Sequence, residues 1–180
     1  MSTTEKLQKL KLILNLQELR TQRESWTAPG LPDGIPRGAL VELLGPSRTE
    51  WFLQFLKMHP ELRTFWAERD QQILPTAIHQ RGVDLRRITF GILGTDSVPS
   101  LRKVIQSQTY EVILAPNKFT EIKIFQAFQL FTEKANNTFF LLGQEKPSTA
   151  WPIALQLEIH QSDDESFQIE ILKQRFGRTQ

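Results

Sequence analysis

From residue 39 onward, short apolar runs alternate with longer segments in which apolar residues recur every three or four positions. The runs have the length of buried strands, and the spaced segments have the period of helices packed on one side. We expect strands over residues 39–44, 62–67, 87–93, 110–115 and 138–142. We expect helices over residues 49–58, 75–81, 99–107 and 120–135. This alternation predicts an α/β fold with a mainly parallel sheet flanked by helices.

The pattern changes its period near the carboxyl terminus. Residues 153–160 and 167–173 alternate between apolar and polar positions, and the polar segment 161–166 separates them. Strict alternation is typical of a strand with one buried and one solvated face. We therefore predict a C-terminal antiparallel hairpin, with one wet face, added to the edge of the sheet.

The amino-terminal residues 2–24 have a helical period, and Ser2 and Glu5 fit a capping box. They carry two leucine stripes, which are Leu7, Leu10 and Leu14, and Leu12, Leu16 and Leu19. Residues 27–36 contain three Pro and two Gly, which predicts a segment without regular structure. The chain then divides into a helix appendage (1–27), a Pro/Gly linker (28–38) and a core domain (39–180).

Two placements are open for the predicted amino-terminal helix. It folds back on its own domain, or it packs through Leu12, Leu16 and Leu19 on another chain, either a second copy or a different protein. A helix that is wet on one side needs a single apolar stripe, so the second stripe favours an external partner.

Length and composition limit the classes of function. The 180 residues suffice for one domain with an appendage, and 39% hydrophobic residues with 12 Phe can form a core. The chain has no Cys, which suits a reducing compartment and excludes cysteine metal sites. We see no signal peptide and no membrane span, so we expect a cytoplasmic protein. The net charge of +2 and pI near 9.0 permit a weak DNA contact without requiring one.

A turn between the first strand and the first core helix has the frame of a phosphate-binding loop. A working loop reads G-x-x-x-x-G-K-S/T, with backbone amides around the phosphates and a Lys at the outer phosphates. Here Gly45, Ser47, Arg48 and Thr49 occupy the turn, and both the second Gly and the Lys are missing. Arg48 and Thr49 are the available substitutes. The turn is either a nucleotide-binding frame that no longer binds nucleotide, or an ordinary strand-to-helix turn with Gly at the bend.

Other candidate residues lie around this turn and on later segments. Trp51 follows the turn, where it would fill an emptied nucleotide site or serve as an anchor for a partner. Five basic residues form either a possible basic patch or a solvated face: Arg81, Arg86, Arg87, Arg102 and Lys103. His59, His79 and His160 lack the spacing of metal ligands, so we predict no metal site.

Three segments resemble the RecA-like superfamily, and within it the ImuA type, a RecA-like accessory protein of bacterial mutagenic DNA repair. Residues 34–45 resemble the entry into the phosphate-loop strand, residues 81–88 the Gly-Val-Asp segment before the third strand, and residues 167–177 the terminal strand. The resemblance implies a RecA-like fold over residues 34–178, and an amino-terminal helix that docks on a neighbouring subunit.

The departures from the family pattern imply that nucleotide chemistry is lost. The family places an Asp at the end of the fourth strand to order Mg²⁺, and the matching strand here ends in Pro116. Glu68 or Asp70 falls near the family's water-activating acid, and Gln144 near its phosphate-sensing Gln. Loss of both Lys and Asp removes the groups that offset phosphate charge. The resemblance therefore implies a non-catalytic chain without cofactor or metal, and the short 143–152 loop argues against filament growth on DNA.

The partners implied by the ImuA type are RecA, a Y-family-like polymerase subunit and an error-prone polymerase in the SOS response and translesion synthesis. An alternative is a cell-division inhibitor of the SulA type, which binds FtsZ; residues 108–115 and 135–142 suit that family too. A further alternative is a residual RecA-like ATPase. Homo-oligomers formed through the amino-terminal helix also remain open.

Overall fold

The computed structural model of the protein describes residues 24–70, 73–162 and 166–175. The predicted amino-terminal helix, including Leu12, Leu16 and Leu19, lies outside these residues and stays a prediction.

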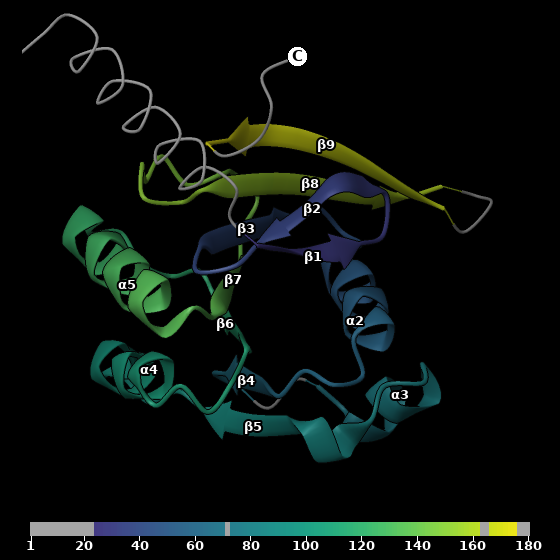
Figure 1. The fold of residues 1–180 in the computed structure, drawn as a ribbon, viewed down its shortest axis with the longest axis horizontal. Helices are drawn as coiled ribbons and strands as arrows, with labels where there is room; N and C mark the ends of the chain where they lie inside the picture. Colours follow the sequence, from purple (N-terminus) through teal and green to yellow (C-terminus); the bar gives the residue numbers. More distant parts are fainter. Residues whose placement is uncertain (1–23, 71–72, 163–165, 176–180) are drawn as a thin grey trace, which may run out of the picture.

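A seven-stranded sheet forms the centre of the molecule, with the strand order β5-β4-β6-β7-β3-β8-β9 (Figure 1). All neighbouring pairs are parallel except β8 and β9, which form an antiparallel hairpin. The strands are β3 (Leu40–Leu44), β4 (Thr64–Glu68), β5 (Ile88–Ile92), β6 (Val112–Pro116), β7 (Thr138–Leu142), β8 (Leu155–Gln161) and β9 (Phe167–Gln174). The predicted α/β class, parallel sheet and C-terminal hairpin are confirmed.

Helices cover both faces of the sheet (Figure 1). One face carries α2 (Arg48–Met58) and α3 (Pro75–Gln80), and the other carries α4 (Ser97–Gln106) and α5 (Ile122–Ala135). A short 3-10 helix, η1 (Leu85–Arg87), leads into β5. Among the described residues, no helix combines the length and apolar character needed to cross a bilayer.

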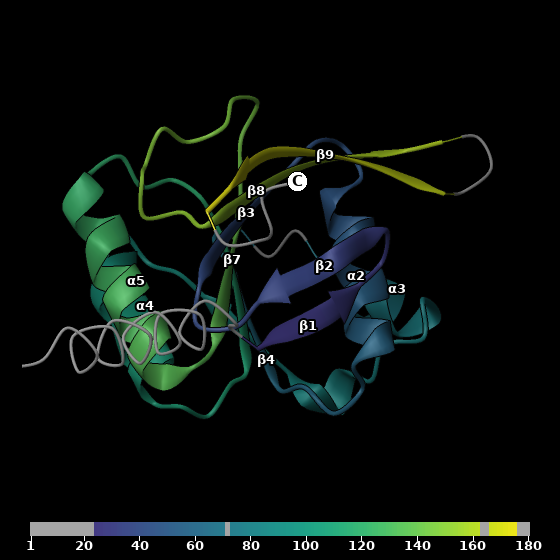
Figure 2. The same ribbon diagram turned by 45° about the horizontal axis from the view of Figure 1, so that its top comes forward.

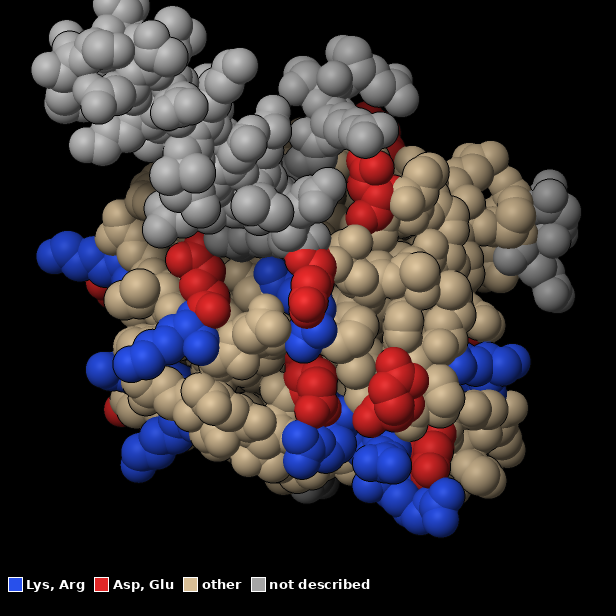
Figure 3. Space-filling view, viewed as in Figure 1, with Lys and Arg blue, Asp and Glu red and all other residues tan. Residues whose placement is uncertain are grey.

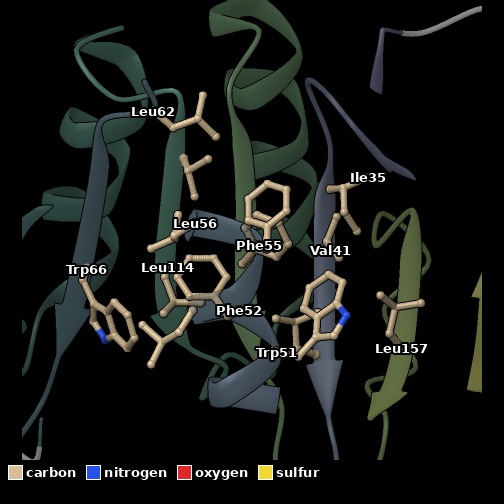
Figure 4. Packing of buried hydrophobic residues seen from close by; sticks show 14 of the residues in the cluster. Ile35, Val41, Trp51, Phe52, Phe55, Leu56, Leu62, Trp66, Leu114 and Leu157 are labelled. Atoms are coloured by element: carbon tan, nitrogen blue, oxygen red, sulfur yellow. The ribbon is translucent and has the colours of Figure 1, made fainter. Parts of the chain in front are cut away.

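The two-residue period of the strands divides the core into two clusters. Val41 and Leu43 of β3 face α2, whereas Leu40 faces the α4–α5 layer. Aromatic rings fill the α2 side, where the Phe52 ring centre lies 5.4 Å from that of Trp66 and 5.1 Å from that of Phe140 (Figure 4). Burial of such large rings stabilises this face.

The expectation that residues 27–36 lack regular structure is wrong. Residues Ser25–Ala28 (β1) and Leu31–Pro36 (β2) pair as an antiparallel hairpin beside α2 (Figure 2). Gly30 and Gly34 both have φ of +68°, so they supply turn and bulge conformations that other residues rarely adopt. Ile35 is fully buried in the α2-side cluster. The hairpin is therefore part of the core and not a linker.

The predicted wet face of the C-terminal hairpin exists on β9 and at the end of β8, but it is wrong for the start of β8. Gln168 and Glu170 of β9 and His160 of β8 are exposed, whereas Gln156 of β8 is only 4% exposed. The reason is that the loop before β8 covers Gln156, whose side-chain amide donates to the Ser148 carbonyl.

Candidate functional site

The carboxyl ends of the parallel strands border a cavity of about 470 Å³, which is where open α/β sheets bind ligands. Six residues that the sequence places in four separate segments line it together: Arg48, Thr49, Glu68, Asp70, Pro116 and Gln144. The structure brings these six residues together although their segments are far apart in the sequence.

The charges around the cavity are mixed. Arg48, Arg69 and Lys118 line it beside the acids Glu68 and Asp70. The Glu68 Oε2 atom accepts a hydrogen bond from the Ile73 amide at 3.3 Å, which links this carboxyl group to the segment before α3. A lining of both signs does not single out a phosphate as the ligand.

The Gly45 turn is shaped by β8. Gly45 has φ of +85°, and a Cβ atom added there would lie 2.3 Å from the carbonyl oxygen of Ile159. The Ser47 amide donates to the same oxygen at 3.3 Å. A phosphate loop uses such amides for its ligand, whereas here one of them is used by a neighbouring strand. The positive φ and the close approach of β8 therefore both require a glycine here, without any ligand.

The structure separates the four predicted loop residues. Arg48 and Thr49 line the cavity, whereas Ser47 lines a different hollow beside the β1–β2 hairpin. Arg48 is bent back on its own loop, since its Nη1 atom donates to the Gly45 carbonyl at 2.7 Å. This arrangement uses part of the guanidinium that would otherwise replace the missing Lys.

Trp51 is not an exposed anchor, so the prediction that it binds a partner is wrong. Its side chain is fully buried on the α2 side, stacks on Phe55 with ring centres 6.1 Å apart, and donates from Nε1 to the Pro29 carbonyl at 2.9 Å (Figure 4). It is also absent from the lining of the carboxyl-edge cavity. The β1–β2 hairpin covers it, and that hairpin was the element missed from the sequence.

The five basic residues are spread over the end of α3, η1 and α4. Arg81 pairs with Glu50 at 2.6 Å, Arg86 pairs with Asp84 at 2.9 Å, and the Arg102 guanidinium lies over the Phe131 ring. Arg87 and Lys103 are exposed. Acidic and basic side chains are intermixed over the lower part of the face in Figure 3, where β5 and α3 lie. These contacts favour a solvated, internally paired surface over a basic patch.

A buried carboxyl group lies at the centre of the carboxyl edge, and our sequence analysis missed it. Glu42 of β3 is only 1% exposed. Its Oε1 atom accepts from Asn117 Nδ2 at 2.5 Å, and its Oε2 atom accepts from Gln156 Nε2 at 2.6 Å and from the Ser148 amide at 2.9 Å. One side chain thus joins β3 to β8, to the residue after β6 and to the loop before β8.

Two basic residues of the β9 region hold the same loop from its other side. Lys173 Nζ donates to the carbonyls of Ala150 and Trp151 at 3.1 and 3.3 Å, and Arg175 Nη1 donates to the Trp151 carbonyl at 2.9 Å. Burial lowers the pKa of Lys173, Arg175 lowers it further, and Glu42 opposes both effects. The 143–152 loop is therefore held in place by polar contacts from three directions.

One signal in the sequence could have revealed this network. Glu42 interrupts the otherwise apolar run 39–44, and a charge inside a strand buried on both faces needs hydrogen-bond partners. Asn117, Ser148 and Gln156 have no pattern of their own that identifies them as those partners.

Among the described residues, no group of three or more His, Asp or Glu side chains is arranged to hold a metal ion. A comparison with protein-family models finds no match, and neither does a comparison with curated protein sequences.

The Gly45 turn generates the first prediction. We expect Gly45→Ala to lower the free energy of unfolding by at least about 2 kcal/mol, since it adds a positive-φ cost to a clash with a backbone oxygen. Gly94→Ala is the matched control, because a Cβ atom there would meet nothing within 4 Å. Urea denaturation of both variants measures the difference. Equal stability of the two would show that β8 does not constrain the turn.

The buried carboxyl group generates the second prediction. We expect Glu42→Ala to cost about 3 kcal/mol or more, because three buried donors lose their acceptor at once. The control Glu170→Ala, at an exposed position on β9, should change stability by less than about 0.5 kcal/mol. Hydrogen exchange should also show faster exchange at the Ser148 amide in Glu42→Ala alone. Unchanged exchange at that amide would contradict the role of Glu42 in holding the loop.

Proposed function

We propose that the protein is a non-catalytic, RecA-like accessory protein of the bacterial DNA-damage response that acts by protein–protein interaction in translesion synthesis. The proposal starts from the resemblance of residues 34–45, 81–88 and 167–177 to the ImuA type. It takes from that resemblance RecA, a Y-family-like polymerase subunit and an error-prone polymerase as partners.

The observation that carries the non-catalytic part is the use of the Gly45 turn by β8. The Ser47 amide is bonded to the Ile159 carbonyl, and the glycine is needed for that close approach. Phosphoryl transfer depends on positioning and charge stabilisation of the phosphates. The turn lacks the second Gly and the Lys, and it is bonded to a neighbouring strand. Both features support the proposal that the turn has kept its packing role and lost its ligand.

The end of β6 supports the same conclusion. Pro116 stands where the family has its Mg²⁺-ordering Asp, and the next residue, Asn117, donates its amide to Glu42 at 2.5 Å. The Gly45 turn and the Asn117 side chain thus both make contacts within the chain. A protein of this kind acts through its surfaces, which fits an accessory role.

The third prediction concerns nucleotide. Calorimetric titration with millimolar Mg-ATP should give no saturable heat, because the phosphate-loop Lys and the strand-end Asp that would offset phosphate charge are both missing. Gly94→Ala serves as a folded control for any dilution heat. A dissociation constant below about 100 µM, which is roughly −5.5 kcal/mol, would favour the residual ATPase instead.

The fourth prediction concerns the partner. The immobilised full chain should retain purified RecA or a Y-family-like polymerase subunit, and it should leave GTP-dependent assembly of FtsZ unchanged. Inhibition of FtsZ assembly at stoichiometric ratio would move the assignment to the SulA type. Failure to retain either DNA-repair protein, with FtsZ also unaffected, would contradict the proposed function.

A further inference from the structure

Strand β5 ends the seven-stranded sheet on the side opposite the C-terminal hairpin, and it lies at the lower boundary of the molecule in Figure 1. Among the described residues, β4 is its one strand neighbour. One side of β5 therefore carries main-chain donors and acceptors that no other described strand uses.

The register shows which residues present these groups. The Leu93 amide donates to the Glu68 carbonyl of β4 at 2.6 Å, so odd-numbered residues direct their main-chain groups toward β4. Because the direction alternates along a strand, Phe90 and Ile92 direct both main-chain groups toward the open edge. The Ile88 amide donates to the Leu85 carbonyl of η1, so Ile88 offers its carbonyl alone. Alternate residues with outward amides and carbonyls are what an added strand requires.

The side chains do not protect this edge. The sequence of β5 is Ile-Thr-Phe-Gly-Ile, without charge or Pro, and the side chains of Phe90 and Ile92 are 38% and 62% exposed. Sheet edges are usually protected by Lys, Pro, bulges or inward charges. The opposite edge strand of the same sheet, β9, carries Glu170 and Lys173, and its pairing with β8 contains a register shift. The two edges of the large sheet thus differ in charge and regularity.

Charge distinguishes an added parallel strand from an antiparallel one. The amino end of β5 follows Arg86 and Arg87 of η1, of which Arg86 already pairs with Asp84. The carboxyl end leads to Asp96, an exposed residue that makes no side-chain capping bond to α4. An antiparallel copy would place the basic end of each strand beside the acidic end of the other, whereas a parallel copy would place like ends together.

We propose that β5 pairs antiparallel with β5 of a second copy of this chain, with Phe90 opposite Phe90 on the two-fold axis. In this register Phe90 exchanges two main-chain hydrogen bonds with its own copy, and Ile88 lies opposite Ile92, where the Ile88 carbonyl accepts from the Ile92 amide. Residues opposite each other in antiparallel strands point to the same face, so Phe90 and Ile92 form one apolar stripe across the junction. A two-fold interface of this kind closes on itself and leaves no free β5 edge.

The test is sedimentation equilibrium of the full chain over a range of concentrations. The wild type should form a dimer, and Ile92→Lys should raise the dissociation constant by at least about tenfold, because it places a charge at an edge position. Leu130→Lys is the matched control, since Leu130 is 61% exposed on α5, away from β5. Circular dichroism and thermal unfolding of each variant establish that it folds.

A charge exchange tests the direction of pairing. Arg87→Glu and Asp96→Arg should each weaken the dimer, and the double variant should restore it, since each basic end then again meets an acidic end. A wild-type chain that stays monomeric at 100 µM, a dimer that survives Ile92→Lys, or a dimer lost only when residues 1–23 are deleted would overturn the proposal. Capture of a strand from a different protein by a monomeric wild type would also overturn it.

Discussion

The contact between the Gly45 turn and the Ile159 carbonyl sets the arrangement of the carboxyl edge. A side chain at residue 45 would meet that oxygen at 2.3 Å, so β8 can lie beside β3 only if the turn has a glycine with positive φ. The path of the turn then places Arg48 and Thr49 toward the cavity and Ser47 toward the hairpin side. Strand packing thereby explains why a glycine stands at residue 45, a position that resembles part of a phosphate-binding loop.

The Glu42 network depends on the same placement of β8. Gln156 can reach the carboxyl group because β8 is parallel to β3 and in register with it, with Glu42 opposite Gln156. A buried acid is costly unless its oxygens accept hydrogen bonds, and three donors meet that need here. The network also fixes the 143–152 loop through the Ser148 amide, so its polarity specifies a structure as well as stabilising it.

Local sequence predicted the core elements well because each has a clear period. The strand expected at residues 138–142 is found with those bounds, and the helix expected at residues 49–58 begins one residue earlier. The β1–β2 hairpin was missed because its Pro and Gly residues indicate turns, while the pairing partner of each short strand depends on tertiary contact. The wrong prediction for Trp51 followed from that omission, because the hairpin covers this side chain. The partners of Glu42 come from residues 117, 148 and 156, which no sequence spacing brings together.

The position of β3 in the sheet has a consequence for the order of folding. It is the first strand of the large sheet in the chain, yet its two neighbours are β7 and β8, about a hundred residues later. During synthesis, the apolar residues Leu40–Leu44 therefore have no sheet partner until most of the chain has been made. The chain entropy lost in closing so long a loop must be overcome before those contacts form, which favours slow folding and early exposure of this segment. A nascent chain of this protein therefore exposes its first core strand until β7 and β8 have been made, and such exposed apolar segments are the ones that chaperones shield.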